Sequence, residues 1–318
     1  SLDVDGTIKL DGNYPTGSNN VAMGDNALNS VASDGNSNTI IGNNAGTAIT
    51  TGDLNTGVGA GALLGTTTSS NNTAFGGIAL CANTTGASNV AVGACALQEN
   101  TTASEHTAVG FCALNANTSG VRNTAVGRQA MKANTTGCCN VGIGSNALLA
   151  GTTGDFNTAV GGASMLAVVT GNNNTAVGAC TLASNTSGAG NVAMGAFSLD
   201  ANLVGSCNVG IGRSALTNTT IGNQTAVGAC SLFTNSTGHS NTAVGYLSSK
   251  LMTTACYTTS LGRQALESTT TGNNGTAVGY HSLKDNTTGD GNTAVGVCSL
   301  VANTEGGASS AVGFQSLV

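Results

Sequence analysis

The fold is decided by a stretch of seventeen residues, Asn123-Thr-Ala-Val-Gly-Arg-Gln-Ala-Met-Lys-Ala-Asn-Thr-Thr-Gly-Cys-Cys139, which recurs along the whole chain. Eighteen copies align on the glycine that closes Thr-Ala-Val-Gly, the first at Gly24 and the last at Gly313. Fifteen of the seventeen intervals between successive glycines are 17 residues, and the other two are 18 and 16. A strict period this short indicates a repeat architecture and takes precedence over isolated motifs.

The repeat is too short for two helices, which need more than about 30 residues. Its positions are numbered 1 to 17 from Asn123, so that Gly127 is position 5. Thr-Ala-Val at positions 2 to 4 places β-branched residues alternately, which is typical of a short strand. We therefore predict an all-β chain, a parallel β-solenoid (β-roll) of about 18 coils with a 17-residue repeat, stacked into a rod about 85 Å long at about 4.8 Å per coil.

Stacking of equivalent positions predicts a narrow core of two apolar columns. Position 4 is apolar in all eighteen copies, and position 9 is Leu or Met in sixteen. If Val126 is buried, Val126→Asp is expected to cost several kcal/mol. The uniformly small residues at positions 3 and 8 suit a very flat coil or a face that packs against further copies of the chain. The predicted core ladder is Val92, Val109, Val126, Ile143 and Val160 at position 4, with Leu97, Leu114, Met131 and Leu148 at position 9.

Asparagine occupies position 1 in thirteen copies. Stacked asparagines can hydrogen-bond through their amides from one coil to the next. Asparagine also tolerates the left-handed backbone of a turn, and the two explanations are compatible. Both are structural, so we predict an Asn ladder rather than a binding site, with members Asn89, Asn123, Asn140, Asn157 and Asn174.

Two segments are expected. Residues 1–19 precede the repeats, and their apolar alternation around Asp5-Gly6 predicts a strand pair that caps the first coil. Residues 20–318 form the repeat array. The chain stops at Val318 inside a coil, so we expect either further sequence after it or stacking of this end on another subunit.

Composition argues against several partners. The chain has eight Lys plus Arg and a net charge of −6, so no nucleic-acid partner is expected. No apolar run is long enough to span a bilayer, so no membrane insertion is expected. Aromatic residues make up 3% and charged residues 7%, unlike an ordinary globular core.

No catalytic grouping is recognisable. The ten cysteines lack metal-binding spacings, and only Cys95 and Cys112 share a column on adjacent coils, where a disulfide is geometrically possible. The three histidines, at 106, 239 and 281, fall in different columns, and the fourteen carboxylates form no pair that the sequence can identify. We expect no enzyme activity, no metal and no cofactor.

The repeat carries a resemblance. Asn-Thr-Ala-Val-Gly followed three residues later by a small residue resembles the head repeat of YadA-like trimeric autotransporter adhesins, whose shorter unit reads Asn-Ser-Val-Ala-Ile-Gly. The longer form with Ala-Leu and Asn-Thr-Thr-Gly is similar to tail-fibre repeats of marine phages and algal viruses, and residues 2–12 look like the lead-in of phage fibre modules. The resemblance implies a homotrimeric fibre located on a virion or an extracellular surface.

The leading hypothesis is a structural fibre, a rigid rod that serves as spacer and host-surface adhesin and that contacts itself and a host glycan or receptor. Alternatives are a bacterial cell-surface trimeric adhesin head and a self-assembling extracellular filament. A third is an ice-binding solenoid, because one threonine row recurs every seventeen residues before it breaks at Val169 and Leu203. That row is Thr84, Thr101, Thr118, Thr135 and Thr152.

Host specificity is expected where the repeat is broken, because a uniform ladder presents the same groups at every level. The coil from Tyr246 to Tyr257 deviates most. Outward residues after the position-5 glycine are further candidates, namely Arg128, Arg213, Arg263 and Tyr280. The predicted surface contact comprises Lys250, Leu251, Met252 and Tyr257.

Overall fold

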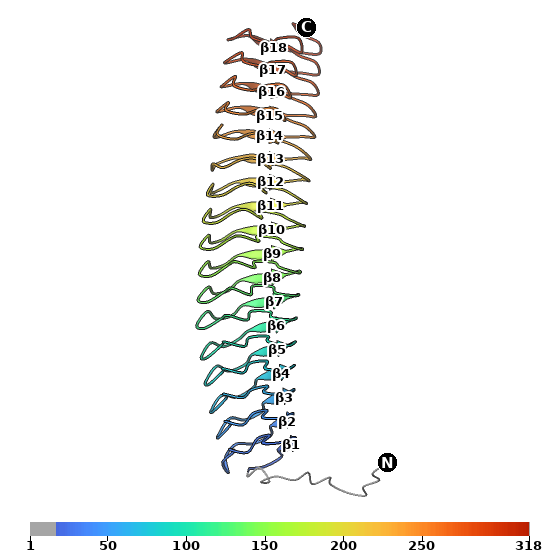
Figure 1. Cartoon of the computed structure of the whole chain (residues 1–318). Coiled ribbons are helices and arrows are strands. Elements are labelled where there is room, and N and C mark those ends of the chain that lie inside the picture. The colour runs from blue at the N-terminus through green and yellow to red at the C-terminus, as the bar shows by residue number, and fades with distance from the viewer. Residues whose placement is uncertain (1–16, 318) are drawn as a thin grey trace, which may run out of the picture. The chain divides into compact units, whose positions relative to one another are not determined.

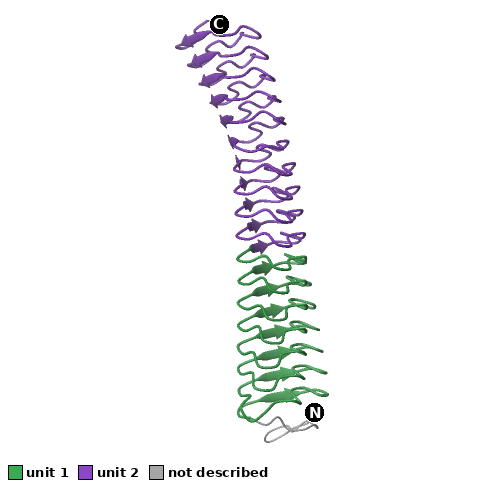
Figure 2. Ribbon diagram, turned by 90° about the vertical axis from the view of Figure 1, so that its left-hand side faces the viewer, with its two compact units in different colours: residues 1–140 green, residues 141–318 purple. Residues whose placement is uncertain are grey.

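The computed structural model describes residues 17–317, which form an all-β solenoid of eighteen parallel three-residue strands, one per repeat (Figure 1). The chain divides into two compact units, residues 1–140 and 141–318 (Figure 2). The predicted fold class is confirmed, whereas the predicted cap at residues 1–19 lies outside the described residues except for its last three. The first unit holds β1 (Val21–Met23), β2 (Thr39–Ile41), β3 (Thr56–Val58), β4 (Thr73–Phe75), β5 (Val90–Val92), β6 (Thr107–Val109) and β7 (Thr124–Val126). The second holds β8 (Val141–Ile143), β9 (Thr158–Val160), β10 (Thr175–Val177), β11 (Val192–Met194), β12 (Val209–Ile211), β13 (Thr225–Val227), β14 (Thr242–Val244), β15 (Thr259–Leu261), β16 (Thr276–Val278), β17 (Thr293–Val295) and β18 (Ser310–Val312).

Within each unit the strands pair in register, so that every repeat position lies over its equivalent in the next coil. In the first unit Ala108 of β6 pairs with Ala125 of β7. The irregular repeat lengths leave this register intact, because Gly210 of β12 still pairs with Ala226 of β13, only 16 residues later. Length differences are therefore absorbed in the turns between strands.

The glycine at position 5 is required by the close approach of successive coils. Gly110 has a φ of 138°, a backbone conformation that residues with a side chain rarely adopt. A Cβ added to Gly110 would lie 2.4 Å from the carbonyl oxygen of Gly127 in the next coil. The same turn is held by the Gly127 N–H, which donates a 2.7 Å hydrogen bond to the carbonyl of Val109.

The strand orientation corrects the predicted core. Position 3 faces the interior, where Ala108 and Ala125 have no exposed surface. Positions 2 and 4 face outward, because successive side chains of a strand point to opposite sides. The predicted buried column at position 4 is therefore wrong: Val92, Val109, Val126 and Val160 are half-buried, and Ile143 is exposed.

The interior admits small residues at positions 3 and 8 because it is narrow. A Cβ added to Gly57 at position 3 would lie 3.1 Å from both Ile40 and Leu63 side chains. The alanines at position 8, such as Ala113 and Ala130, are equally buried inside their own coils. The idea that these small columns form a face against other copies of the chain is therefore wrong.

Position 9 supplies the large apolar side chains of the interior. Leu97, Leu114, Met131 and Leu148 are at most 2% exposed. Their backbones are left-handed, with φ between 50° and 52°, which costs about 1–2 kcal/mol for a residue other than glycine. Burial of a leucine side chain contributes about 1.5–3 kcal/mol and outweighs that strain.

The asparagines at position 1 form a buried ladder, as the sequence suggests, although the backbone takes part. The side-chain oxygen of Asn157 accepts hydrogen bonds from both the backbone N–H and the side-chain amide of Asn174, at 3.0 and 3.1 Å. In the first unit Asn89 donates its backbone N–H to Asn72, and Asn140 donates its own to Asn123. Each rung thus satisfies backbone groups that would otherwise be buried without a partner.

A second buried ladder, which the sequence did not identify, lies at position 12. Asn100, Asn117 and Asn134 each donate a side-chain N–H to the amide oxygen of the asparagine one coil earlier, at 3.1, 2.9 and 2.9 Å. Each also donates to a carbonyl three residues ahead, which closes the turn. The Asn-Thr-Thr-Gly turn is therefore anchored inside the coil by its asparagine.

Candidate functional site

The coil that deviates most from the repeat has both exposed and buried irregular residues. Leu251 and Tyr257 are 42% and 61% exposed, and Lys250 is half-buried. The ring of Tyr257 meets the ring of His239 edge-on at a centroid distance of 4.8 Å. Met252 has no exposed surface, so its assignment to the predicted contact surface is wrong.

Met252 is buried because it replaces the missing interior leucine. Position 9 of this coil is Ser249, and position 12 holds Met252 in place of the ladder asparagine. Ser260 stands at position 3 of the next coil, and its hydroxyl is 2.7 and 2.8 Å from the hydroxyls of Ser248 and Ser249. The irregular residues of these two adjacent coils therefore form one adjusted interior, while Leu251 faces solvent.

Outward residues at position 6 define the clearest surface feature of the described chain. From β14 onward this position holds an exposed column that we name the aromatic column. Aromatic rings occupy every second coil, with Arg263 and Val297 in the coils between them. Its members are Tyr246, Arg263, Tyr280, Val297 and Phe314.

Two rings of the column flank a cation. The Arg263 guanidinium carbon lies 5.8 Å from the centroid of the Tyr246 ring and 5.5 Å from that of Tyr280. These distances are within the range of cation–π attraction. A guanidinium nitrogen of Arg263 also lies 3.4 Å from the Tyr280 hydroxyl oxygen. No carboxylate of residues 17–317 forms an ion pair with Arg263.

Polar side chains continue beside the column. The His281 ring stacks on the Tyr280 ring at 3.7 Å, and its Nε2 lies 2.8 Å from the amide oxygen of Gln264. Gln264 in turn donates a 2.7 Å hydrogen bond to Glu267. Burial, followed by the charges of Lys284 and Arg263, lowers the pKa of His281, while Glu267 and Asp285 oppose that shift. The flank therefore combines flat rings, fixed hydrogen-bonding groups and local cations.

The aromatic column is confined to the last five coils. Earlier in the second unit, position 6 carries small residues such as Ser145, Gly162 and Ala179, with Arg213 as the exception. In the first unit it offers one exposed aromatic residue, Phe111, with Arg128 in the following coil. Arg263 and Tyr280 were predicted from the sequence as outward residues, whereas the contacts that join them to Tyr246 appear only in the structure.

The threonine row considered for ice binding uses its hydroxyl hydrogens internally. Thr84 and Thr118 donate hydrogen bonds of 3.0 Å to the carbonyls of Thr101 and Thr135, one coil ahead. Thr152 donates likewise to Val169. These hydroxyls close the turn ladder, which weakens the case for an ordered ice-binding face.

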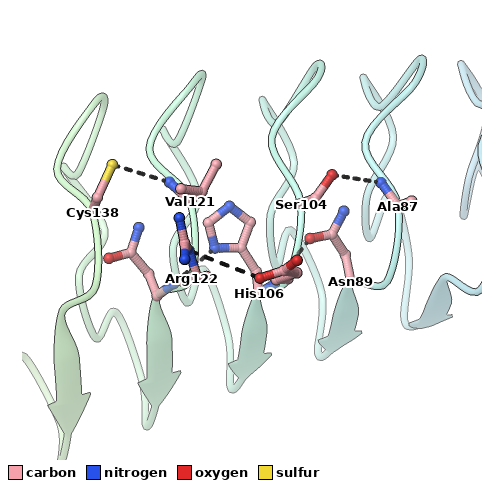
Figure 3. A network of polar contacts seen from close by, with 9 residues as sticks. Ala87, Asn89, Ser104, His106, Val121, Arg122 and Cys138 are labelled. Carbon is pink, nitrogen blue, oxygen red and sulfur yellow. Dashed lines mark hydrogen bonds and ion pairs between the residues drawn. The ribbon is translucent and has the colours of Figure 1, made fainter.

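His106 takes the place of an asparagine in the first ladder and is 1% exposed (Figure 3). The backbone N–H of Asn123 donates to its Nδ1 at 3.2 Å, and its own N–H donates to the amide oxygen of Asn89 at 3.1 Å. Burial lowers the pKa of His106 to about 4, against the opposing hydrogen bonds with the backbone of Asn123 and Gly120. His106 is therefore neutral above that pH and serves the ladder.

The thiols and metal-ligating groups form no recognisable centre. The ten cysteines are all free thiols. Burial and the neighbouring Cys95 raise the pKa of Cys112, which makes its thiolate scarcer. Within residues 17–317 no three His, Cys, Asp or Glu side chains are placed to hold a metal ion, and no helix could cross a membrane.

Comparisons with known proteins give no match to a family model, to a curated protein or to a solved structure.

Proposed function

We propose that this chain is a structural fibre protein of a viral or extracellular appendage, which acts as a spacer and host-surface adhesin. The observation that supports the proposal is the pair of buried amide ladders. Within each unit, neighbouring coils are joined by strand and turn hydrogen bonds and, at most levels, by side-chain amides, as between Asn157 and Asn174 or between Asn117 and Asn134. Such cross-linked coils expose little unpaired backbone, which suits mechanical stiffness and resistance to proteases.

Self-association is part of the proposal, and the outward sheet face is its best candidate surface. The apolar side chains at position 4 are half-buried or exposed, including Ile143 and Leu261. A row of apolar side chains on an accessible sheet face marks an interaction surface. We propose that copies of the chain, as trimers, meet through this face rather than through the small residues at positions 3 and 8.

The assembly is tested with the purified chain and two matched variants. Val126→Lys places a charge on the outward face, whereas Thr118→Lys places the same charge on an exposed turn. Light scattering should give a trimer for the unmodified chain and for Thr118→Lys, and a lower mass for Val126→Lys. A monodisperse monomer for the unmodified chain would remove trimerisation from the proposal.

The cellular role is tested by immunogold electron microscopy of native material. The proposal expects label along fibres attached to virions. Label on a lawn at a bacterial surface would favour the adhesin alternative, and unattached long filaments would favour self-assembly. Label inside cells without any appendage would contradict the fibre proposal.

A further inference from the structure

We propose that the aromatic column of the last five coils is a binding surface for an acidic polysaccharide, with uronate-type carboxylates held at Arg263 and pyranose rings stacked on the flanking aromatic residues. The inference deepens the proposed adhesin function and gives its ligand a chemical class.

The first argument is the regular spacing of exposed rings. Tyr246, Tyr280 and Phe314 occupy every second coil, and Tyr246 and Phe314 are 50% and 73% exposed. Two coils correspond to about 10 Å along the stack, since neighbouring strands lie about 4.8 Å apart. An extended polysaccharide repeats its orientation every two sugars over a comparable length. A linear chain of sugars could therefore meet equivalent rings in succession.

The second argument is the cation held between two of these rings. Arg263 contacts both Tyr246 and Tyr280, which fixes the direction of its guanidinium group. Guanidinium groups bind carboxylates through two parallel N–H bonds. Because no carboxylate of residues 17–317 forms an ion pair with Arg263, its N–H groups are available to an external anion.

The third argument is the local charge. Three of the eight Lys and Arg residues of the chain, Lys250, Arg263 and Lys284, fall within residues 250–284. Arg263 and Lys284 both lie near enough to His281 to lower its pKa. Glu267 and Asp285 also lie near enough to His281 to raise its pKa, so they offset part of this positive charge. In a chain with a net charge of −6, residues 250–284 carry these three cations against the single carboxylate of Glu267.

A protein partner fits the column less well. The rings form a line one residue wide, because Leu247, Gln264 and His281 at position 7 are only partly exposed. Stable protein interfaces bury about 800 Å² on each partner over a broad patch. A narrow row of flat rings and hydrogen-bonding groups matches a linear polymer of sugars more closely.

The test is affinity electrophoresis of the full chain in native gels that contain polygalacturonate, with neutral dextran as the comparison polymer. Two variants probe the column: Tyr246→Ala/Tyr280→Ala removes stacking, and Arg263→Gln removes the charge. The matched control is Phe111→Ala/Arg128→Gln, which makes the same kinds of change at position 6 of the first unit. Circular dichroism verifies that all variants fold.

We expect polygalacturonate to retard the unmodified chain and the control equally. Either column variant should weaken the association constant by about tenfold or more, equivalent to about 1.4 kcal/mol. Should the tyrosine variant fold poorly, Arg263→Gln alone still decides the question. The inference is overturned if polygalacturonate does not retard the chain, if the control weakens binding as much, or if column variants change only the sedimentation coefficient, which would make the column a contact between copies.

The two proposals can fail separately. If the chain binds polygalacturonate but immunogold labels no appendage, the ligand proposal is supported and the fibre proposal is contradicted. If virion fibres are labelled but the chain does not bind polygalacturonate, the fibre proposal is supported and the ligand proposal is contradicted.

Discussion

The regular coil around Leu114 and the irregular coil around Ser249 build similar interiors from different residues. In the regular coil Leu114 fills the interior and Asn117 continues the amide ladder. In the irregular coil Ser249 leaves space, and Met252 at the ladder position fills it. In this irregular coil the apolar volume missing at position 9 is therefore supplied at position 12.

A second irregular coil, in the first unit, also has a small residue at position 9 and an apolar residue at position 12. Gly46 stands at position 9, and the apolar Ile49 replaces the asparagine at position 12. Ile40 at position 3 adds further volume, and both isoleucines are fully buried. A Cβ added to Gly46 would already lie 3.0 Å from the Ile49 side chain. In both irregular coils, an apolar residue at position 12 thus occupies interior space that a small residue at position 9 leaves open.

The largest effect is expected from removing Met252, the apolar position-12 residue that compensates for Ser249 in the second unit. Met252→Asn removes a fully buried side chain beside Ser249 and should lower the free energy of unfolding by about 2–4 kcal/mol. Leu251→Asn, one residue earlier, changes an exposed side chain and should stay within about 0.5 kcal/mol. Guanidinium-induced unfolding measures both.

Adding Ser249→Leu sharpens the same comparison. Alone, Ser249→Leu overfills the interior and should cost about 1–3 kcal/mol. Combined with Met252→Asn it recreates the regular pair, so the double variant should be more stable than the sum of the single changes by about 0.5–3 kcal/mol. Additive effects would show that the two positions do not share one space.

His106 predicts the next largest effect, in its pH dependence. Its pKa is 6.5 when unfolded and about 4 when folded, so the unfolded state takes up a proton first as pH falls. Stability is therefore full above pH 6.5 and declines toward pH 4, by about 3 kcal/mol in total. His106→Asn, which restores the ladder residue, should remove this part of the decline in urea unfolding curves. Identical pH profiles would contradict the assignment.

The smallest effect compares a buried rung with an exposed one. Asn117→Ala removes amide bonds to Asn100 and Asn134 inside the coil and should cost about 1–3 kcal/mol. Thr118→Val removes one exposed turn bond to Thr135 and should cost about 0.5 kcal/mol. Thermal unfolding of both variants measures the difference in stability. Equal losses of stability would mean that the position-12 ladder contributes no more than an exposed turn hydrogen bond.

The seventeen-residue period was sufficient to predict the fold class, the stacking and the leucine column. Position 4 was predicted to be buried, whereas position 3 is the buried position of the strand. The prediction was wrong because Val126 is more hydrophobic than Ala125 and was therefore preferred as a core residue. The available clue was uniformity: position 3 varies little because it faces a narrow interior. The burial of Met252 was missed because it depends on Ser249, a neighbour through space rather than by pattern. At position 6, Arg263 and Tyr280 were predicted as outward residues, but the contact between their side chains depends on the spacing of the stacked coils.

The central claim is that position 3, rather than position 4, faces the interior. One comparison tests it directly: Ala125→Asp and Val126→Asp introduce the same side chain at adjacent residues, and guanidinium unfolding measures each. Ala125→Asp places an unpaired charge at a fully buried position and should cost more than about 4 kcal/mol or prevent folding. Val126→Asp changes a half-buried outward residue and, compared with the other variant as dissociated single chains, should cost about 1 kcal/mol or less. The reverse order would contradict the orientation of every strand described above.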